Sequence, residues 1–265
     1  MSSIIELSPL DLSLAALLVV ALAAVTRRLQ LQIAGRLLLS AMRTAIQLSL
    51  IGLVLKALFA SEAPGWVALM ALVMVLAAGR EVHARQKRRL RGAWGFGIGL
   101  SAMFISSFAV TLLALSTVIH AEPWYAPRYA IPLLGMLLGN TMNGVALALN
   151  QLTQSVRAHR AAIETRLALG QTKSEAIDQL RRESIRTGLI PIVNAMAAAG
   201  IVSLPGMMTG QILAGNPPVD AVKYQILIMF LIAGGTGFGT LAAVWMSAHR
   251  LFDDRHRLRL DRLEG

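Results

Sequence analysis

The stretch Tyr129–Gln151, which reads YAIPLLGMLLGNTMNGVALALNQ, decides the fold class because it is long, apolar and free of charged residues. A helix needs about 20 mostly apolar residues to cross a membrane, and this run is long enough to do so. The segment that follows it, Leu152–Thr187, is rich in Arg and Lys. The sequence therefore predicts a membrane-spanning helix that ends in a basic segment on one side of the membrane.

Apolar runs of comparable length recur on both sides of this stretch. Together they predict seven membrane-spanning helices: Leu10–Val25, Leu37–Phe59, Gly65–Gly79, Trp94–Ile119, Tyr129–Gln151, Gly188–Leu213 and Val222–Ala248. The third run is the shortest, and Trp66 and Arg80 at its two ends are residue types that anchor short spans at a membrane surface. The predicted fold is an all-α polytopic membrane helix bundle, formed by one transmembrane permease domain over residues 1–265.

Most of the 25 Lys and Arg residues lie in connections that alternate with acidic or neutral ones. The basic connections are Arg27–Arg36, Arg80–Arg91, Arg157–Arg186 and Arg250–Arg262, and the others contain Glu62, Glu122 or Asp220. Basic connections stay on the cytoplasmic side, so seven crossings place the amino terminus outside and the carboxyl terminus inside a cell inner membrane. The leading segment carries acidic Glu6 and Asp11 rather than positive charge, and Arg27-Arg28 follow the apolar run, which indicates an uncleaved span rather than a signal peptide.

Composition excludes several classes of function. Hydrophobic residues make up 55% of the chain and charged residues 15%, which is less charge than a soluble domain of this size carries. The net charge of +11 is explained by the basic connections, and aromatic residues do not interleave with them, so nucleic-acid binding is not expected. The chain has no cysteine, which excludes disulfides, thiolate metal sites and a Cys nucleophile.

Polar residues inside the spans mark a candidate translocation path, since burying them in hydrocarbon is unfavourable. The second span carries a polar stripe at helical spacing, and the sixth span is predicted to break at Pro205-Gly206, where proline removes a backbone donor. The candidates are Arg43, Gln47, Asn140, Asn143, Asn194, Met207, Met208 and Gln211. Bracing between helices is the alternative role of Arg43, and a structural kink is the alternative explanation of the break. Metal ligands, if any, are not identifiable, and each of the five histidines is expected at the surface.

The segment Leu152–Thr187 is predicted to contain two helices that meet at Gly170. Gly170 is placed as the C-terminal cap of the first helix, and Thr172 and Glu175 have the spacing of a capping box at the start of the second. Glu164 and Gly170 also have the spacing found in permeases of ATP-driven transporters, at the helix–turn that docks on the ATPase. The predicted coupling residues are therefore Glu164, Leu167, Gly170, Thr172 and Glu175, and a solvated loop is the alternative.

Several motifs together resemble the FetB family of bacterial permease subunits, which is related to plant aluminium-tolerance membrane subunits. The motifs occur in order over residues 8–250 and are Glu81–Gln86, Pro132–Met136, Gly139–Gly144, Glu164–Gly170 and Ser203–Gly210. The resemblance implies a permease for iron export and a separate cytoplasmic ATPase, called FetA in bacteria. The plant relatives imply a nucleotide-sugar as an alternative cargo.

The chain has no Walker lysine motif, so ATP and Mg are expected in the partner ATPase and no catalytic residue or cofactor in this chain. We expect a homodimer of this permease in the lipid bilayer with two ATPase subunits on its cytoplasmic face. Two alternatives stay open at this point: an exporter of an anionic solute, and an ATP-independent channel or membrane scaffold.

Overall fold

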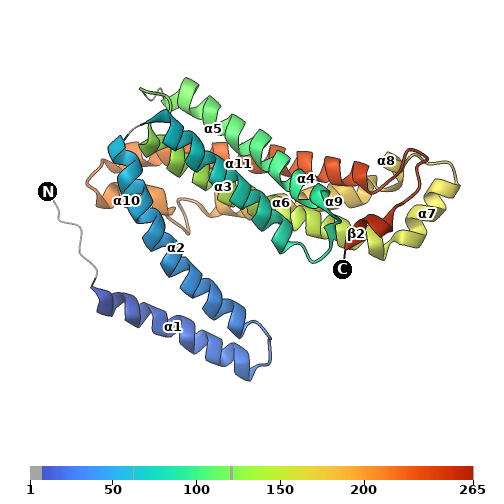
Figure 1. Cartoon of the computed structure of the whole chain (residues 1–265), viewed down its shortest axis with the longest axis horizontal. Helices are drawn as coiled ribbons and strands as arrows, with labels where there is room; N and C mark the ends of the chain where they lie inside the picture. Colours follow the sequence, from blue (N-terminus) through green and yellow to red (C-terminus); the bar gives the residue numbers. More distant parts are fainter. Residues whose placement is uncertain (1–7, 62, 120–121, 265) are drawn as a thin grey trace. The chain divides into compact units, whose positions relative to one another are not determined.

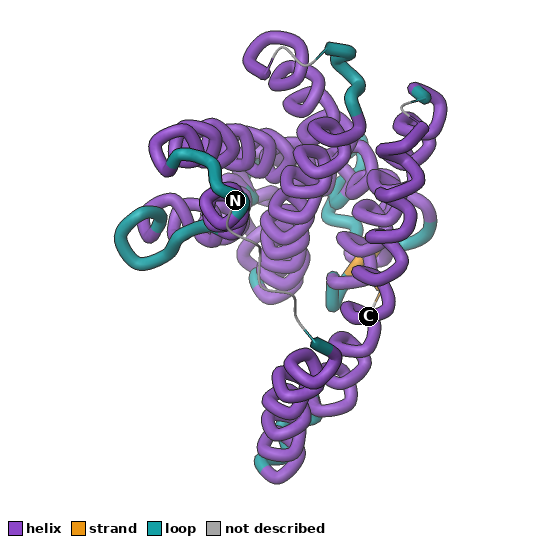
Figure 2. Tube along the Cα trace, turned by 90° about the vertical axis from the view of Figure 1, so that its left-hand side faces the viewer, coloured by secondary structure: helices purple, strands orange, loops and turns teal. Residues whose placement is uncertain are grey.

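The computed structural model describes residues 8–61, 63–119 and 122–264, and helices dominate this part of the chain (Figure 1, Figure 2). Contacts divide the chain into two compact units. The first is Met1–Ala63 with Leu213–Gly215, and the second is Pro64–Ile212 with Asn216–Gly265. The joint action of these units as one permease domain stays a prediction.

The first unit contains two helices, α1 (Pro9–Arg28) and α2 (Ala34–Ser61), which pack on each other. Ser8 caps α1, because its hydroxyl accepts a hydrogen bond from the Asp11 amide at 3.3 Å and the Asp11 carboxylate accepts one from the Ser8 amide at 2.8 Å. Large apolar side chains such as Leu18 and Leu53 are exposed. Surfaces of this kind are stable in lipid rather than in water.

The second unit is built around two long helices, α6 (Pro127–Ala158) and α11 (Pro218–Arg250), which pack along each other (Figure 1). Three further helices surround them: α3 (Pro64–Arg85), α4 (Ala93–Met103) and α9 (Asp178–Ala198). The core includes the fully buried side chains Val82, Met103, Leu137, Leu152 and Val244. Close van der Waals packing of this kind holds helices together in a bilayer.

Six helical segments of the described chain are long and apolar enough to cross a membrane. They agree with the predicted spans, except that α3 continues through Arg80 to Arg85 and is therefore long enough for a full crossing rather than a short one. The predicted span Gly188–Leu213 is absent from these six because it is divided, so seven crossings stay a prediction.

The division of that span begins earlier than the sequence predicts. Helix α9 ends at Ala198, and α10 (Gly206–Leu213) begins only after an irregular segment, whereas Pro205-Gly206 was the expected break. Gly200 adopts a left-handed φ of +82° and its amide donates a hydrogen bond to the Ser203 carbonyl at 2.9 Å. A turn through Gly200 therefore ends the helix before the proline is reached.

The fourth span contains two wide turns that the sequence analysis did not predict. After α4 come the π-helix η1 (Phe104–Phe108), the short helix α5 (Ala109–Leu113) and the π-helix η2 (Ala114–Ile119). In η1 the buried hydroxyl of Ser106 donates to the Ala102 carbonyl at 2.6 Å. Hydroxyls that bond to the preceding turn satisfy backbone groups at a helix irregularity inside a membrane.

The basic connections of the second unit gather at one end. Strand β1 (Arg89–Leu90), which follows α3, pairs antiparallel with strand β2 (Leu263–Glu264) near the end of the chain. The Lys173 amide, in the segment between α6 and α9, donates to His256 Nδ1 at 3.2 Å. We call this the basic end: it holds the α3–α4 connection, the α6–α9 connection and the chain after α11.

Candidate functional site

The α6–α9 connection forms a helix–turn–helix elbow at the basic end, and its turn requires glycine. Helix α7 (Arg160–Ala168) is capped by Leu169, and Gly170 then adopts a φ of +89°. The Gly170 amide donates to the Leu167 carbonyl at 3.0 Å, and the Gln171 amide donates to the Arg166 carbonyl at 3.1 Å. These bonds satisfy the last carbonyls of α7, and the left-handed backbone disfavours any residue with a Cβ at position 170.

The predicted capping box at the start of the next helix, α8 (Lys173–Ala176), is present. The Glu175 carboxylate accepts hydrogen bonds from the Thr172 amide at 2.7 Å and the Thr172 hydroxyl at 2.8 Å, and the Thr172 hydroxyl accepts one from the Glu175 amide at 3.3 Å. The bond from the Thr172 amide is the main reason that the pKa of Glu175 is lowered. Thr172 and Glu175 therefore set the direction in which the chain leaves the turn.

Apolar side chains fix the inner face of the elbow and leave its tip outside. Ile163 and Ile177 are buried, Leu167 packs against the same core, and the Arg166 guanidinium donates to the Ala176 carbonyl at 3.2 Å across the turn. Leu169, at the tip, is 79% exposed. The elbow is thus anchored on its inner face, while the apolar side chain at its tip is mostly exposed.

Glu164 lies on the exposed face of α7 and has a local ion pair. Its carboxylate accepts a hydrogen bond from Arg160 Nε, one turn earlier, at 2.8 Å. Pairs of this type stabilise an exposed helix only slightly. Glu164 therefore lies at the surface of the elbow and has no buried role.

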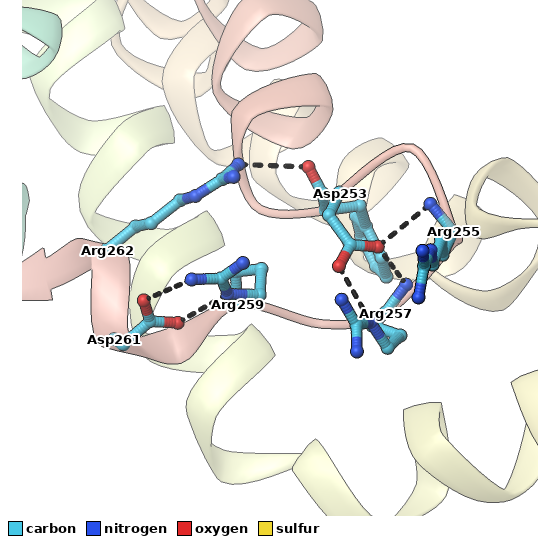
Figure 3. Close-up of polar contacts among 7 residues, drawn as sticks. Asp253, Arg255, Arg257, Arg259, Asp261 and Arg262 are labelled. Atoms are coloured by element: carbon cyan, nitrogen blue, oxygen red, sulfur yellow. Dashed lines mark hydrogen bonds and ion pairs between the residues drawn. The ribbon is translucent and has the colours of Figure 1, made fainter.

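The chain after α11 folds into an ordered tail, residues 251–264, that the sequence analysis missed. The Asp253 carboxylate accepts hydrogen bonds from the Arg255 amide at 3.0 Å, the Arg257 amide at 2.9 Å and Arg257 Nε at 2.8 Å (Figure 3). The Arg257 amide is the main reason that the pKa of Asp253 is lowered. The Asp253 carboxylate thus closes a turn in a segment whose composition predicts a solvent-exposed basic loop.

Arginine side chains fix the remainder of the tail. Arg262 Nη1 donates to the Arg250 carbonyl at 2.7 Å and to the Phe252 carbonyl at 3.0 Å, which ties the short helix η3 (Leu260–Arg262) back to the end of α11. Arg259 makes a two-pronged ion pair with Asp261, whose hydrogen bonds lower the pKa of Asp261 to about 2. The signal that could have revealed this was the presence of three acidic residues, Asp253, Asp254 and Asp261, among the arginines of residues 253–262.

The tail joins the elbow to the α3–α4 connection. On one side, the β1–β2 pair is extended by a bond from the Arg91 amide to the Arg262 carbonyl at 2.8 Å. On the other side, His256 accepts the bond from the Lys173 amide described above. Between tail and elbow lies a shallow groove whose lining is Glu164, Leu167, Ala168, Gln171, Arg255, His256, Arg257 and Leu258. The coupling candidates Glu164 and Leu167 therefore share one surface with the tail.

Two of the path candidates, Asn140 and Asn143, lie on α6 but have different partners. The Asn140 amide donates to the Met136 carbonyl of its own helix at 2.8 Å. The Asn143 carbonyl oxygen accepts a hydrogen bond from the Arg85 guanidinium of α3. Asn150, near the basic end of α6, accepts from the Lys87 amide at 3.2 Å. Polar side chains of α6 therefore brace it against the end of α3.

A glycine–hydroxyl contact zone lies where α6, α9 and α11 cross. A Cβ on Gly144 would lie 2.6 Å from Thr236 Cγ2 and 2.8 Å from the Gly188 carbonyl oxygen. The buried hydroxyls of Thr236 and Thr240, with those of Ser107 and Thr141, have no hydrogen-bond partner among the described residues. The motif Gly139–Gly144 stood out in the sequence only by resemblance. In the structure, Gly144 of this motif allows α6, α9 and α11 to approach closely.

The other path candidates are distributed over different parts of the chain. Arg43 and Gln47 belong to α2 in the first unit, and Asn194 is exposed on α9. Met207, Met208 and Gln211 lie half-buried in α10. The side-chain oxygen of Gln211 is buried, and among the described residues it has no hydrogen-bond partner. A continuous path through these residues stays a prediction.

Metal-ligating side chains do not converge within residues 8–61, 63–119 and 122–264. No three His, Asp or Glu residues of this part of the chain lie close enough together to hold a metal ion. His83 is half-buried between α3 and α4, with its Nδ1 lacking a partner in the same part of the chain, while His256 binds the elbow. His120 lies outside the described residues.

Comparison with known proteins identifies a family over almost the whole chain. Residues 9–252 match the family described as Uncharacterised protein family (UPF0014). The chain is 40% identical to a UPF0014 membrane protein of Synechocystis over 86% of both chains, and 34% identical to the "Probable iron export permease protein FetB" of Escherichia coli over 96% of both. It is 33% identical to "Protein ALUMINUM SENSITIVE 3" of Arabidopsis thaliana, over 92% of this chain and 88% of that one. No solved structure matches.

Proposed function

Because the chain belongs to the UPF0014 family of membrane permeases, we propose that it is the membrane subunit of an ATP-driven transporter. Its elbow would contact a separate FetA-like ATPase, which binds ATP and Mg and hydrolyses the nucleotide. The assembly would contain two copies of the permease and two of the ATPase in a cell inner membrane. This chain would transmit movement and would perform no chemical step itself.

The observation that carries this proposal is the build of the elbow. Its inner face is anchored in the core by Ile163 and Ile177, and its tip exposes Leu169 beside Gly170. A force applied to the tip would therefore be transmitted to α6 and α9, which adjoin the two arms of the elbow. An element that is anchored in two spans and exposed to a partner is suited to coupling them to ATP hydrolysis.

The same arrangement supports a topology with the basic end in the cytoplasm. Helices α6 and α11 both finish at the basic end, so the chain between them has to return to the opposite end. We propose that α9, the irregular segment and α10 together make this return and form the sixth crossing along the chain, which brings the total to seven. The amino terminus would then lie outside and the carboxyl terminus inside.

Iron is the cargo that the relatives favour. The printed name of the Escherichia coli relative refers to probable iron export. The alternative cargo, an anionic solute such as a nucleotide-sugar, is favoured by the Arg85 guanidinium, which reaches from α3 to Asn143 of α6. Binding of Fe(II) and of a nucleotide-sugar to the assembled transporter distinguishes them: saturable binding of only the nucleotide-sugar would reject iron.

Coupling through the elbow is tested by two substitutions, measured as ATPase stimulation and transport in proteoliposomes with the partner ATPase. Gly170→Val forces a β-branched residue into a left-handed turn and should abolish both activities. Leu169→Ala removes an exposed side chain without disturbing the backbone and should lower stimulation by about tenfold or more, as for loss of an apolar interface anchor.

The matched control is Val219→Ala, which truncates an exposed apolar side chain at the start of α11. It should retain both activities. Wild-type stimulation by the Leu169→Ala and Gly170→Val proteins would remove the elbow from the mechanism. Transport by the purified permease without any ATPase would instead support a channel.

A further inference from the structure

A groove on the second unit lies between α4 and α11 at the basic end and is not used by the elbow or by the path candidates. Its volume is about 520 Å³, and its lining includes Trp94, Gly97 and Ser101 of α4 and Trp245, His249 and Arg250 of α11. The two helices pack side by side in this unit (Figure 1). From Trp94 to Ser101 the groove follows α4 for about 10 Å, given a rise of about 1.5 Å per residue.

The two ends of the groove differ in chemistry. At the basic end, the Arg250 guanidinium lies over the Trp94 ring, 4.5 Å from its centroid, and the His249 ring lies 4.9 Å from that of Trp245. Farther along, the lining consists of Gly97, Ile98 and the Trp245 ring, with Ser101 beyond. The groove thus has one cation at its mouth and an apolar lining along the remainder of its length. This polarity matches a phospholipid, which has a charged headgroup and apolar acyl chains.

The charge of the lining selects the headgroup. No lining residue of the groove is acidic, and Arg250 contributes a guanidinium cation. Trp94 and Trp245 are both more than half exposed, and tryptophan is the residue type that favours the headgroup level of a membrane. A basic pocket between spanning helices at this level attracts an anionic headgroup rather than a neutral or zwitterionic one.

We propose that this groove binds one anionic phospholipid from the leaflet at the basic end. The phosphate contacts Arg250 at the mouth, and an acyl chain lies along Gly97, Ile98 and Trp245. A lipid in this position touches the last turn of α11, directly before the tail. Through this site a membrane lipid would contact the end of α11, next to the tail that binds the elbow. This contact does not depend on the transported cargo.

The experiment measures quenching of tryptophan fluorescence by phospholipids with brominated acyl chains. The full-length protein carries Trp66→Phe and Trp124→Phe, so that emission comes from Trp94 and Trp245. It is reconstituted with brominated phosphatidylglycerol or with brominated phosphatidylcholine of the same acyl chains. The proposal predicts half-maximal quenching at a several-fold lower mole fraction of phosphatidylglycerol, and equal quenching by the two lipids would overturn it.

Arg250→Gln tests the headgroup contact. The backbone carbonyl of residue 250, which accepts the bond from Arg262, is unchanged by this substitution. The preference for phosphatidylglycerol should fall to within about twofold of parity, since one charge near the surface contributes about 1 kcal/mol. Arg186→Gln removes an exposed arginine of α9 outside the groove and should keep the full preference. Retention of the full preference by Arg250→Gln contradicts the proposal.

Gly97→Leu tests occupation of the groove by the acyl chain. A Cβ at position 97 meets no atom within 4 Å, so a leucine there can fill the groove without strain. Quenching by phosphatidylglycerol should fall to the level of phosphatidylcholine. Gly237→Leu, at an equally open position of α11 outside the groove, is the control and should not change quenching. If neither lipid quenches the parent protein, protein rather than lipid covers the groove and the proposal is wrong.

Discussion

Two glycines on α6, Gly139 and Gly144, have opposite surroundings although they belong to one motif. A Cβ at Gly139 meets no atom within 4 Å, whereas one at Gly144 would lie 2.6 Å from Thr236 Cγ2 and 2.8 Å from the Gly188 carbonyl oxygen. Helix propensity changes by the same amount at both positions when alanine replaces glycine. The difference between the two substitutions therefore measures close packing alone.

Gly144→Ala should destabilise the protein by about 1–3 kcal/mol relative to Gly139→Ala, because α9 and α11 must move away from α6. The measurement is the thermal unfolding midpoint of the purified protein in detergent, with Gly139→Ala as the reference. Equal midpoints for the two variants would show that the three helices do not approach as closely as described.

Asp253 stabilises the turn in the tail by accepting hydrogen bonds from Arg255 and Arg257. Asp253→Asn should open this turn and increase the rate of trypsin cleavage after both arginines severalfold at neutral pH, because local opening exposes the backbone to the protease. Asp254→Asn, at the exposed neighbouring position, is the matched control and should leave cleavage unchanged. Equal rates for the two variants would contradict an ordered tail.

The same carboxylate gives the tail a pH dependence with a defined sign. Because the pKa of Asp253 in the folded protein is lower than its ordinary value of 3.8, its contribution is present above that value and lost as pH falls through the lowered pKa. Pepsin cleavage in residues 251–264 should therefore accelerate as the pH falls below about 4 in the wild type. Asp253→Asn should be cleaved rapidly throughout, and a wild-type rate independent of pH would reject this role.

At the scale of the elements, hydrophobic run length predicted the apolar helices well because burial in lipid depends on composition rather than on detailed contacts. The turn at Gly170 and the cap at Thr172 were also predictable, since each depends on local residue types. The end of α9 at Ala198 was not, because alanines favour a helix and only the tertiary structure shows where the turn through Gly200 begins. The tail was missed because its order depends on pairing with β1, far away in the sequence.

Site residues were harder to predict than elements. The coupling candidates are neighbours in the sequence, so their proximity in the elbow follows from local structure. The path candidates depend on which faces of distant helices meet, and helical spacing alone does not determine this. Asn143 illustrates the difficulty: its partner is Arg85, a residue that sequence analysis had placed in a basic connection rather than in a span.

At the scale of the whole molecule, the absence of cysteine makes the proposed topology directly testable. Single cysteines at Gln30, Ser174, Asn216 and Asp254 would lie in exposed turns, in the elbow or in the tail. A membrane-impermeant maleimide added to intact spheroplasts should label position 216 alone, and the other three positions should require permeabilised membranes. Labelling of position 254 in intact spheroplasts would reject a cytoplasmic carboxyl terminus.

The π-helices η1 and η2 have a consequence for how this protein is compared with others. Each wide turn holds about one residue more than an α-helical turn of the same height, so every side chain beyond it is rotated by roughly a quarter turn. Removal of one residue within Phe104–Phe108 would restore ordinary winding and would swing the later part of the span onto a different neighbour. A gap of a single position in an alignment at this point would therefore mark a change of helix face and not the loss of a contact.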